Sequence, residues 1–135
     1  MRLHALIVED DEPLSIVLRY NLEAEGFAVT AATSAEEAEL VIRASLPDLI
    51  LLDWALPGRS GIAFCRDLRS RPETRHIGIL LLTAKAEDAD RERGLAAGAD
   101  VFLVKPFSLE HLVSSIRSRL APVRSSIAGM HAVES

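Results

Sequence analysis

Four side chains able to take part in phosphoryl chemistry stand where short apolar runs of the sequence end. Asp53 and Thr83 each close such a run, and Asp10 and Lys105 follow two others. A carboxylate can attack a phosphoryl group when the charge on the phosphoryl oxygens is neutralised, which a metal ion, an ammonium group and a hydroxyl can do. We interpret Asp53 as the candidate nucleophile, with Lys105 and Thr83 as candidate contacts of the phosphoryl group.

A cluster of acidic residues suggests a metal site beside the candidate nucleophile. Glu9, Asp10 and Asp11 follow the first apolar run, and Asp53 ends a later one. Carboxylates gathered in one place repel each other unless a cation joins them, and hard oxygen ligands suit Mg²⁺, with Mn²⁺ as an alternative. Any one of these residues alone could be a solvated loop residue or a helix cap. Their joint placement favours a metal held by Asp10 and Asp53.

These side chains meet only if the segments before them are parallel strands. Strand and helix patterns alternate five times, with strands expected at 3–8, 27–32, 48–53, 77–82 and 101–104, and helices at 12–25, 34–44, 60–72, 87–97 and 108–120. The alternation predicts an α/β fold with a mostly parallel, doubly wound sheet. Ligands of such sheets bind at the carboxyl ends of the strands, where all four candidate residues fall.

Size, charge and composition narrow the function classes. The 135 residues fit one domain, and we expect it over 1–120, with a flexible tail or truncated linker over 121–135. The net charge of −5 argues against direct nucleic-acid binding by this domain. Because the sequence has no long apolar run and no signal-peptide pattern, we expect no membrane contact and a cytoplasmic location. The single cysteine, Cys65, is expected to be a buried thiol.

Four segments resemble the receiver domains of response regulators, over residues 3–120: Val8-Glu9-Asp10-Asp11, Leu51-Leu52-Asp53-Trp54-Ala55-Leu56-Pro57-Gly58, Leu82-Thr83-Ala84 and Val104-Lys105-Pro106-Phe107. The phrases Gly94-Leu95 and Gly98-Ala99-Asp100 are similar to the branch of transcription regulators that includes PhoB and OmpR. The resemblance implies a flavodoxin-like (βα)5 fold with strand order 2-1-3-4-5.

The same resemblance assigns roles to individual residues. It implies that a histidine kinase or a phosphotransfer protein phosphorylates Asp53. It implies Mg²⁺ held by Asp10, Asp53 and the backbone carbonyl of Ala55, with Glu9 in support. Thr83 and Lys105 would contact the phosphoryl group. Trp54, beside the nucleophile, is expected to pack at the edge of the site.

The resemblance also implies how the signal leaves the site. Thr83 would move toward the new phosphoryl group while Phe102, on the last strand, turns inward and changes the surface formed by the fourth helix, the last strand and the last helix. Output would be control of transcription through an attached or partner domain. The alternative is a stand-alone receiver that acts through protein contacts or as a phosphorelay intermediate. Neither reading is an enzyme that turns over a free substrate.

The family's phosphorylation-dependent homodimer is a further expectation, and here the sequence departs from the pattern. Arg91 and Asp100 are kept, but Val101, His111 and Ser115 stand where the branch usually has charged partners. These departures weaken the charge matching on which that dimer depends.

Three other classes are less well supported. A Mg²⁺-dependent phosphatase with an aspartyl nucleophile would normally carry an acidic residue two positions on, where Ala55 stands. A nucleotide-binding module would need a glycine-rich turn after the first strand, and Glu9-Asp10-Asp11 would repel phosphate instead. An interaction module without phosphorylation would not need Asp10, Asp53, Thr83 and Lys105 together.

Overall fold

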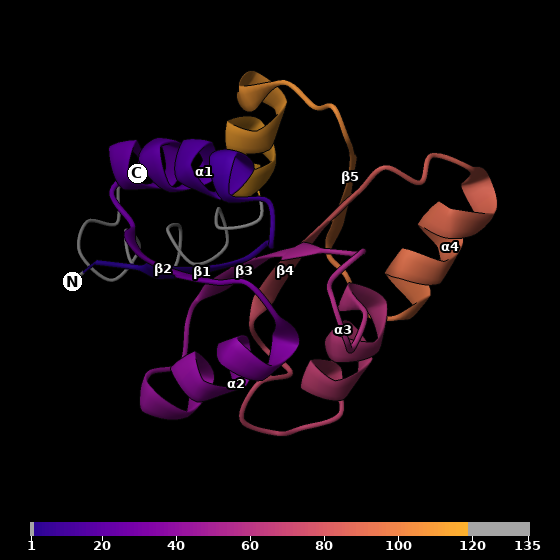
Figure 1. Ribbon diagram of the computed structural model, residues 1–135, viewed down its shortest axis with the longest axis horizontal. Coiled ribbons are helices and arrows are strands. Elements are labelled where there is room, and N and C mark those ends of the chain that lie inside the picture. The colour runs from indigo at the N-terminus through magenta and orange to yellow at the C-terminus, as the bar shows by residue number, and fades with distance from the viewer. Residues whose placement is uncertain (1, 119–135) are drawn as a thin grey trace, which may run out of the picture.

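The chain forms one parallel sheet, and the computed structural model describes its residues 2–118 (Figure 1). The strands are β1 (His4–Val8), β2 (Ala28–Ala32), β3 (Leu49–Asp53), β4 (Gly78–Thr83) and β5 (Val101–Val104). They lie in the order β2-β1-β3-β4-β5, and every neighbouring pair is parallel. The predicted fold class and strand order are confirmed.

The helices are α1 (Glu12–Ala24), α2 (Ala35–Ala44), α3 (Gly61–Arg69) and α4 (Asp88–Ala96), and a further helix covers residues 109–118. Polar side chains cap the N-termini of α1, α2 and α3, whereas Glu87 at the N-terminus of α4 makes no such hydrogen bond. The hydroxyls of Ser34 and Ser60 accept from the backbone N–H groups of Glu37 and Ala63, each at 3.2 Å. Ser34 and Ser60 are the first residues of the helices that the sequence predicted at 34–44 and 60–72.

Helices cover both faces of the sheet, so the strands are apolar on both sides. In Figure 1, α1 and the helix 109–118 lie on one face and α2 and α3 on the other, while α4 stands beyond β4 and β5. All five residues of β3 are buried. Leu49 and Leu51 pack toward α1, and Ile50 and Leu52 toward the opposite face. The central strand is thereby fixed from both sides, and with it the position of Asp53 at its end.

The structure moves most of the predicted boundaries by at most one residue, but α3 ends at Arg69, three residues before the predicted end at residue 72. β4 begins at Gly78 and ends at Thr83, and α4 is a residue shorter at each end than predicted. Cys65 is buried as expected. Within the described part of the chain, no helix is long and apolar enough to cross a membrane. The tail predicted over 121–135 lies outside the described residues.

Candidate functional site at the carboxyl edge of the sheet

Three charged side chains from distant parts of the sequence meet at the edge where the strands end. Lys105 Nζ donates to Asp53 Oδ1 and to Glu9 Oε1, each at 2.9 Å. Glu9 is 1% exposed and Asp53 is 4% exposed, whereas the Lys105 side chain retains 24% exposure. One ammonium group therefore compensates two nearly buried carboxylates.

The surroundings shift the titration of this cluster. Burial raises the pKa of Glu9 above its ordinary value, although hydrogen bonds from Lys105 and from the Asp11 amide act in the opposite direction. Burial alone would lower the pKa of Lys105. Its hydrogen bonds to Glu9 and Asp53 and their charges outweigh burial, so the pKa of Lys105 is raised. Lys105 thus carries its positive charge throughout the physiological range.

The hydroxyl of Thr83 lies at the same edge. Asp53 pairs with Leu82 across the β3–β4 ladder, so Thr83 extends one residue past the level of Asp53. Thr83 is 2% exposed, and its Oγ1 accepts from the Lys85 amide at 2.9 Å. The Lys105 amide donates to the Thr83 carbonyl at 2.7 Å, which connects the β4 and β5 ends of the site.

Oxygen ligands for a cation converge beside this cluster. Glu9, Asp10 and Asp53 each offer a carboxylate oxygen, and these oxygens all lie within 4.8 Å of one another. Such a spacing, with two of the three residues buried and no sulfur ligand, fits a hard divalent cation. Ala55 is exposed in the loop after β3. The structure separates Asp11 from this group, because its carboxylate caps α1 by accepting from the Leu14 amide at 3.3 Å.

Aromatic and cationic side chains border the site on the side of α4. The rings of Trp54 and Phe102 make an edge-to-face contact with centroids 6.3 Å apart. Lys85 and Arg93 lie 5.6 Å and 5.2 Å from the centre of the Trp54 ring, and Arg91 lies 5.2 Å from that of Phe102. Trp54 is buried at the edge of the site, as the sequence predicted. The cations around the two rings were not predicted, and the only sequence signal for them was the basic residues in and before α4.

A family comparison agrees with this geometry. Residues 5–117 match the model of the response regulator receiver domain, which is most of the chain. The chain belongs to the response regulator receiver family. The sequence-based identification of the family is therefore confirmed.

Curated relatives place this receiver near the PhoB and OmpR branch. It is 50% identical over 121 residues to the phosphate regulon transcriptional regulatory protein PhoB of Rhizobium meliloti, covering 90% of this chain and 53% of that protein. Identity to PhoB of Escherichia coli is 42% over 121 residues, covering 87% and 53%. The chain thus spans about half the length of the curated relatives that it matches.

Solved structures share the fold of this receiver. A two-component response regulator from Clostridium difficile has a TM-score of 0.83 at 29% identity, covering 89% of this chain and 97% of that one. The chemotaxis response regulator CheY4 of Vibrio cholerae also has a TM-score of 0.83, at 27% identity, covering 89% and 100%. The likeness extends over 89% of this chain and nearly all of each solved chain.

The structure also locates the residues of the expected dimer surface of the receiver. The Asp100 carboxylate accepts from Arg69 Nη2 and from the Ile79 amide, each at 2.9 Å, so it is already bound within its own chain. The guanidinium of Arg91 lies against Phe102. Two charged groups that the sequence suggested for a partner are thus engaged in internal contacts.

Proposed function

We propose that this receiver is a signalling switch in which Asp53 accepts a phosphoryl group from a phosphohistidine of a histidine kinase or a phosphotransfer protein. The observation that carries the proposal is the pair of 2.9 Å bonds by which Lys105 holds Asp53 and Glu9 at the carboxyl edge of the sheet. In the full protein, the changed surface would control transcription through an attached or partner output domain. A stand-alone receiver or a phosphorelay intermediate is the alternative.

The transfer step needs a nucleophile and a charge partner on the chain. An oxygen of the Asp53 carboxylate attacks phosphorus, the bond from phosphorus to the histidine nitrogen breaks, and that nitrogen keeps the electron pair. Because the Lys105 ammonium already bonds to Asp53, it is placed to donate to the negatively charged phosphoryl oxygens once the group has been transferred. The Thr83 hydroxyl, now bonded to the Lys85 amide, is the second donor available at this edge.

The residues around Asp53 fit a divalent metal, Mg²⁺ or Mn²⁺. Asp10, Asp53 and the Ala55 carbonyl would hold it, with Glu9 in support, and their carboxylate oxygens converge within 4.8 Å. When bound, the metal would neutralise charge on the phosphoryl oxygens during transfer. Glu9 is buried and bonded to both Lys105 and the Asp11 amide, so it is suited to fixing the cluster.

The signal would leave through Thr83 and Phe102. Phe102 is 4% exposed and packs against Trp54 and Gly94, which connects the edge of the site to α4. A Thr83 hydroxyl drawn toward a phosphoryl group must give up its bond to the Lys85 amide. The contacts around Phe102 would then rearrange, and the surface that α4 and β5 present to a partner would change with them.

The phosphodonor protein would bind over α1, next to the site. Leu14, Val17, Phe107 and Leu109 line an apolar groove that Lys105 also borders, and Ile16, Val17 and Tyr20 are exposed on α1. We expect Val17→Asp to slow transfer from a phosphorylated kinase but to leave phosphorylation by acetyl phosphate unchanged. Leu40→Asp on α2 is the matched control, because Leu40 is also an exposed apolar residue on a helix. Equal loss with both donors would contradict this assignment.

The chain would not turn over free substrates. Hydrolysis of the aspartyl phosphate returns the switch to its resting state, and Ala55 offers no side-chain acid or base to assist it. The rival reading, a phosphatase, predicts sustained release of phosphate from small phosphoesters. A rate of release above that of the Asp53→Asn variant would favour the phosphatase.

The deciding experiment is phosphorylation by acetyl phosphate in the presence of Mg²⁺, followed by intact mass. We expect one phosphoryl adduct that requires the metal and is absent from Asp53→Asn. Asp11→Asn is the matched control, because Asp11 caps α1 and asparagine is an equally good cap. An adduct that survives Asp53→Asn, or no adduct on the wild-type chain, would overturn the proposal.

The phosphorylated form is proposed to pair with a second copy through α4, β5 and the helix 109–118. Sedimentation with beryllofluoride and Mg²⁺ should then show a dimer that is absent without them. An unchanged monomer would remove the dimer from the proposal, in line with the internal bonds of Asp100.

A further inference from the structure

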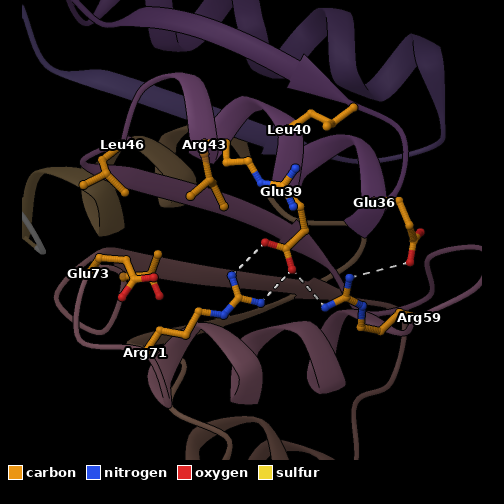
Figure 2. A pocket seen from close by; sticks show the side chains of 10 residues that line it. Glu36, Glu39, Leu40, Arg43, Leu46, Arg59, Arg71 and Glu73 are labelled. Carbon is orange, nitrogen blue, oxygen red and sulfur yellow. Dashed lines mark hydrogen bonds and ion pairs between the residues drawn. The ribbon is translucent and has the colours of Figure 1, made fainter.

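Arg59 connects the loop after Asp53 to two helices. This loop runs from residue 54 to residue 60, between β3 and α3. Arg59 Nη1 donates to Asp67 Oδ2 of α3 at 2.7 Å and to Glu39 Oε2 of α2 at 3.2 Å. Its Nη2 lies 3.7 Å from Glu36 Oε2, also on α2 (Figure 2). The guanidinium also lies 5.2 Å from the centre of the buried Phe64 ring.

The acidic partner on α2 is held in place from a second side. Arg71, in the segment after α3, donates to both oxygens of Glu39, at 2.8 Å and 2.7 Å. Figure 2 shows the two guanidinium groups approaching the Glu39 carboxylate from opposite sides. The hydrogen bond from Arg71, with that from Arg59, lowers the pKa of Glu39 despite its partial burial. Arg59 therefore binds a fixed partner rather than a mobile surface carboxylate.

The two ends of the loop are fixed by backbone bonds. The Trp54 amide donates to the Leu82 carbonyl at 2.9 Å, and the Gly61 amide donates to the Trp54 carbonyl at 2.8 Å. A side chain at Gly61 would clash with the Asp53 carbonyl oxygen, so the loop returns close to its own start. Between these ends, Ala55 is exposed and Leu56 is buried. Among the described side chains of this loop, Arg59 makes the polar contacts that reach α2.

We propose that Arg59 is a positioning residue that holds this loop and thereby sets the place of the Ala55 carbonyl relative to Asp10 and Asp53. The inference rests on the proposed function, in which that carbonyl helps to hold a divalent cation. Small displacements of a binding group weaken a site strongly, because the ligands must converge on one point. Arg59 would then control metal affinity without touching metal or phosphate.

The test is a titration with Mg²⁺ alone, followed by Trp54 fluorescence, for wild type and Arg59→Met. Removing a group that supports a metal ligand typically costs about 10- to 100-fold in metal affinity. Because Arg59 acts only through the loop backbone, its removal should cost about 10-fold. We expect weaker Mg²⁺ binding by about that factor. The rate of phosphorylation by acetyl phosphate should fall at low Mg²⁺ and return to the wild-type rate at saturating Mg²⁺.

Two variants separate positioning from general stability. Arg71→Met removes the other partner of Glu39 outside the loop, so it should lower the free energy of unfolding to a similar extent while leaving Mg²⁺ affinity within about twofold. Arg59→Lys keeps the charge but not the forked donors, so its Mg²⁺ affinity should lie between those of wild type and Arg59→Met. If Arg59→Met fails to fold, Asp67→Asn, which weakens the 2.7 Å bond from the other side, takes its place.

The outcomes also separate this inference from the proposed function. A wild-type chain that is not phosphorylated on Asp53 refutes the proposed function. The Mg²⁺ titration would still test whether Arg59 controls metal affinity. Unchanged Mg²⁺ affinity in Arg59→Met, or an equal loss in Arg71→Met, would overturn the positioning role. So would a phosphorylation rate that stays low at saturating Mg²⁺, because the defect would then lie in transfer itself.

Discussion

Replacing Lys105 by methionine should make the resting chain less stable and, at the same time, improve its binding of a divalent cation. The methionine keeps most of the apolar stem but removes the charge that compensates Glu9 and Asp53, both within 2.9 Å of it. Removing one partner of a buried ion pair typically costs about 3–5 kcal/mol. The Lys105 side chain is 24% exposed, so we expect a loss of about 2–4 kcal/mol in the absence of metal.

The cation should recover part of this loss. With Lys105 gone, a divalent ion no longer competes with an ammonium group for Glu9 and Asp53, so its affinity should rise by about tenfold, or roughly 1.4 kcal/mol. Phosphorylation should nevertheless become about 100-fold slower or more, because a donor to the phosphoryl oxygens is missing. Tighter metal binding combined with slower phosphoryl transfer would show that Lys105 both compensates the two carboxylates and donates to the phosphoryl oxygens.

The loss should also depend on pH. In the wild-type chain burial raises the pKa of Glu9, and the Lys105 hydrogen bond opposes that rise. Without Lys105 the pKa of Glu9 climbs further, and the folded state disfavours its ionised form. A raised pKa contributes stability at low pH that disappears as pH rises through the folded-state value. The stability difference between variant and wild type should therefore be largest at neutral pH and shrink toward acidic pH.

Urea unfolding with and without Mg²⁺, together with a Mg²⁺ titration, measures these quantities. Lys85→Met is the matched control, because Lys85 contacts the Trp54 ring and is exposed, and it should change stability by less than about 0.5 kcal/mol. Unchanged stability of Lys105→Met without metal, or Mg²⁺ binding that weakens in parallel with phosphorylation, would refute the charge-compensation argument.

Three further predictions test the structure. Gly61→Ala should cost about 3 kcal/mol in urea unfolding by forcing backbone to move. Gly58→Ala, at φ 74° with only an ordinary 3.6 Å contact to Glu36 Oε1, should cost about 1 kcal/mol. Burial raises the pKa of Cys65 to about 11, so the folded chain should resist thiol reagents at pH 8 and lose up to about 2.7 kcal/mol of stability as pH rises from 9 to 11. Gly94→Ala would bring a methyl group within 2.9 Å of the Phe102 ring, and a shift in tryptophan fluorescence should report the displaced ring.

The sequence predicted the sheet and the edge of the site for one physical reason. The carboxyl ends of parallel strands meet, so Asp53, Thr83 and Lys105 had to lie near one another once the βα alternation was recognised. Caps such as Ser34 and Ser60 are local and could be read from adjacent residues. The functional roles of Asp53, Thr83 and Lys105 stay predictions until phosphorylation is measured.

Other contacts could not be predicted because they depend on how helices pack. The sequence predicts Asp10 as a metal ligand but assigns Asp11 no separate role, and only the direction of α1 shows that the Asp11 carboxylate caps that helix. Arg59 reaches α2 across a loop and meets Glu39, 20 residues away in sequence. Such pairings are set by rotamers and by the placement of whole helices, which periodicity does not encode.

The uneven attachment of the helices indicates where a signal would travel. Only Gly94 of α4 is buried, whereas α2 and α3 bury several residues and are also joined through Arg59. Besides the close packing of Gly94 against Phe102 and Leu81, α4 contacts the Phe102 and Trp54 rings through Arg91 and Arg93, and such contacts are worth about 0.5–1 kcal/mol each when exposed. A rearrangement at Thr83 and Phe102 worth a few kcal/mol is enough to change such contacts but not to separate α2 from α3. Phosphorylation of Asp53 is therefore expected to alter the α4 surface and to leave the α2–α3 surface as it is.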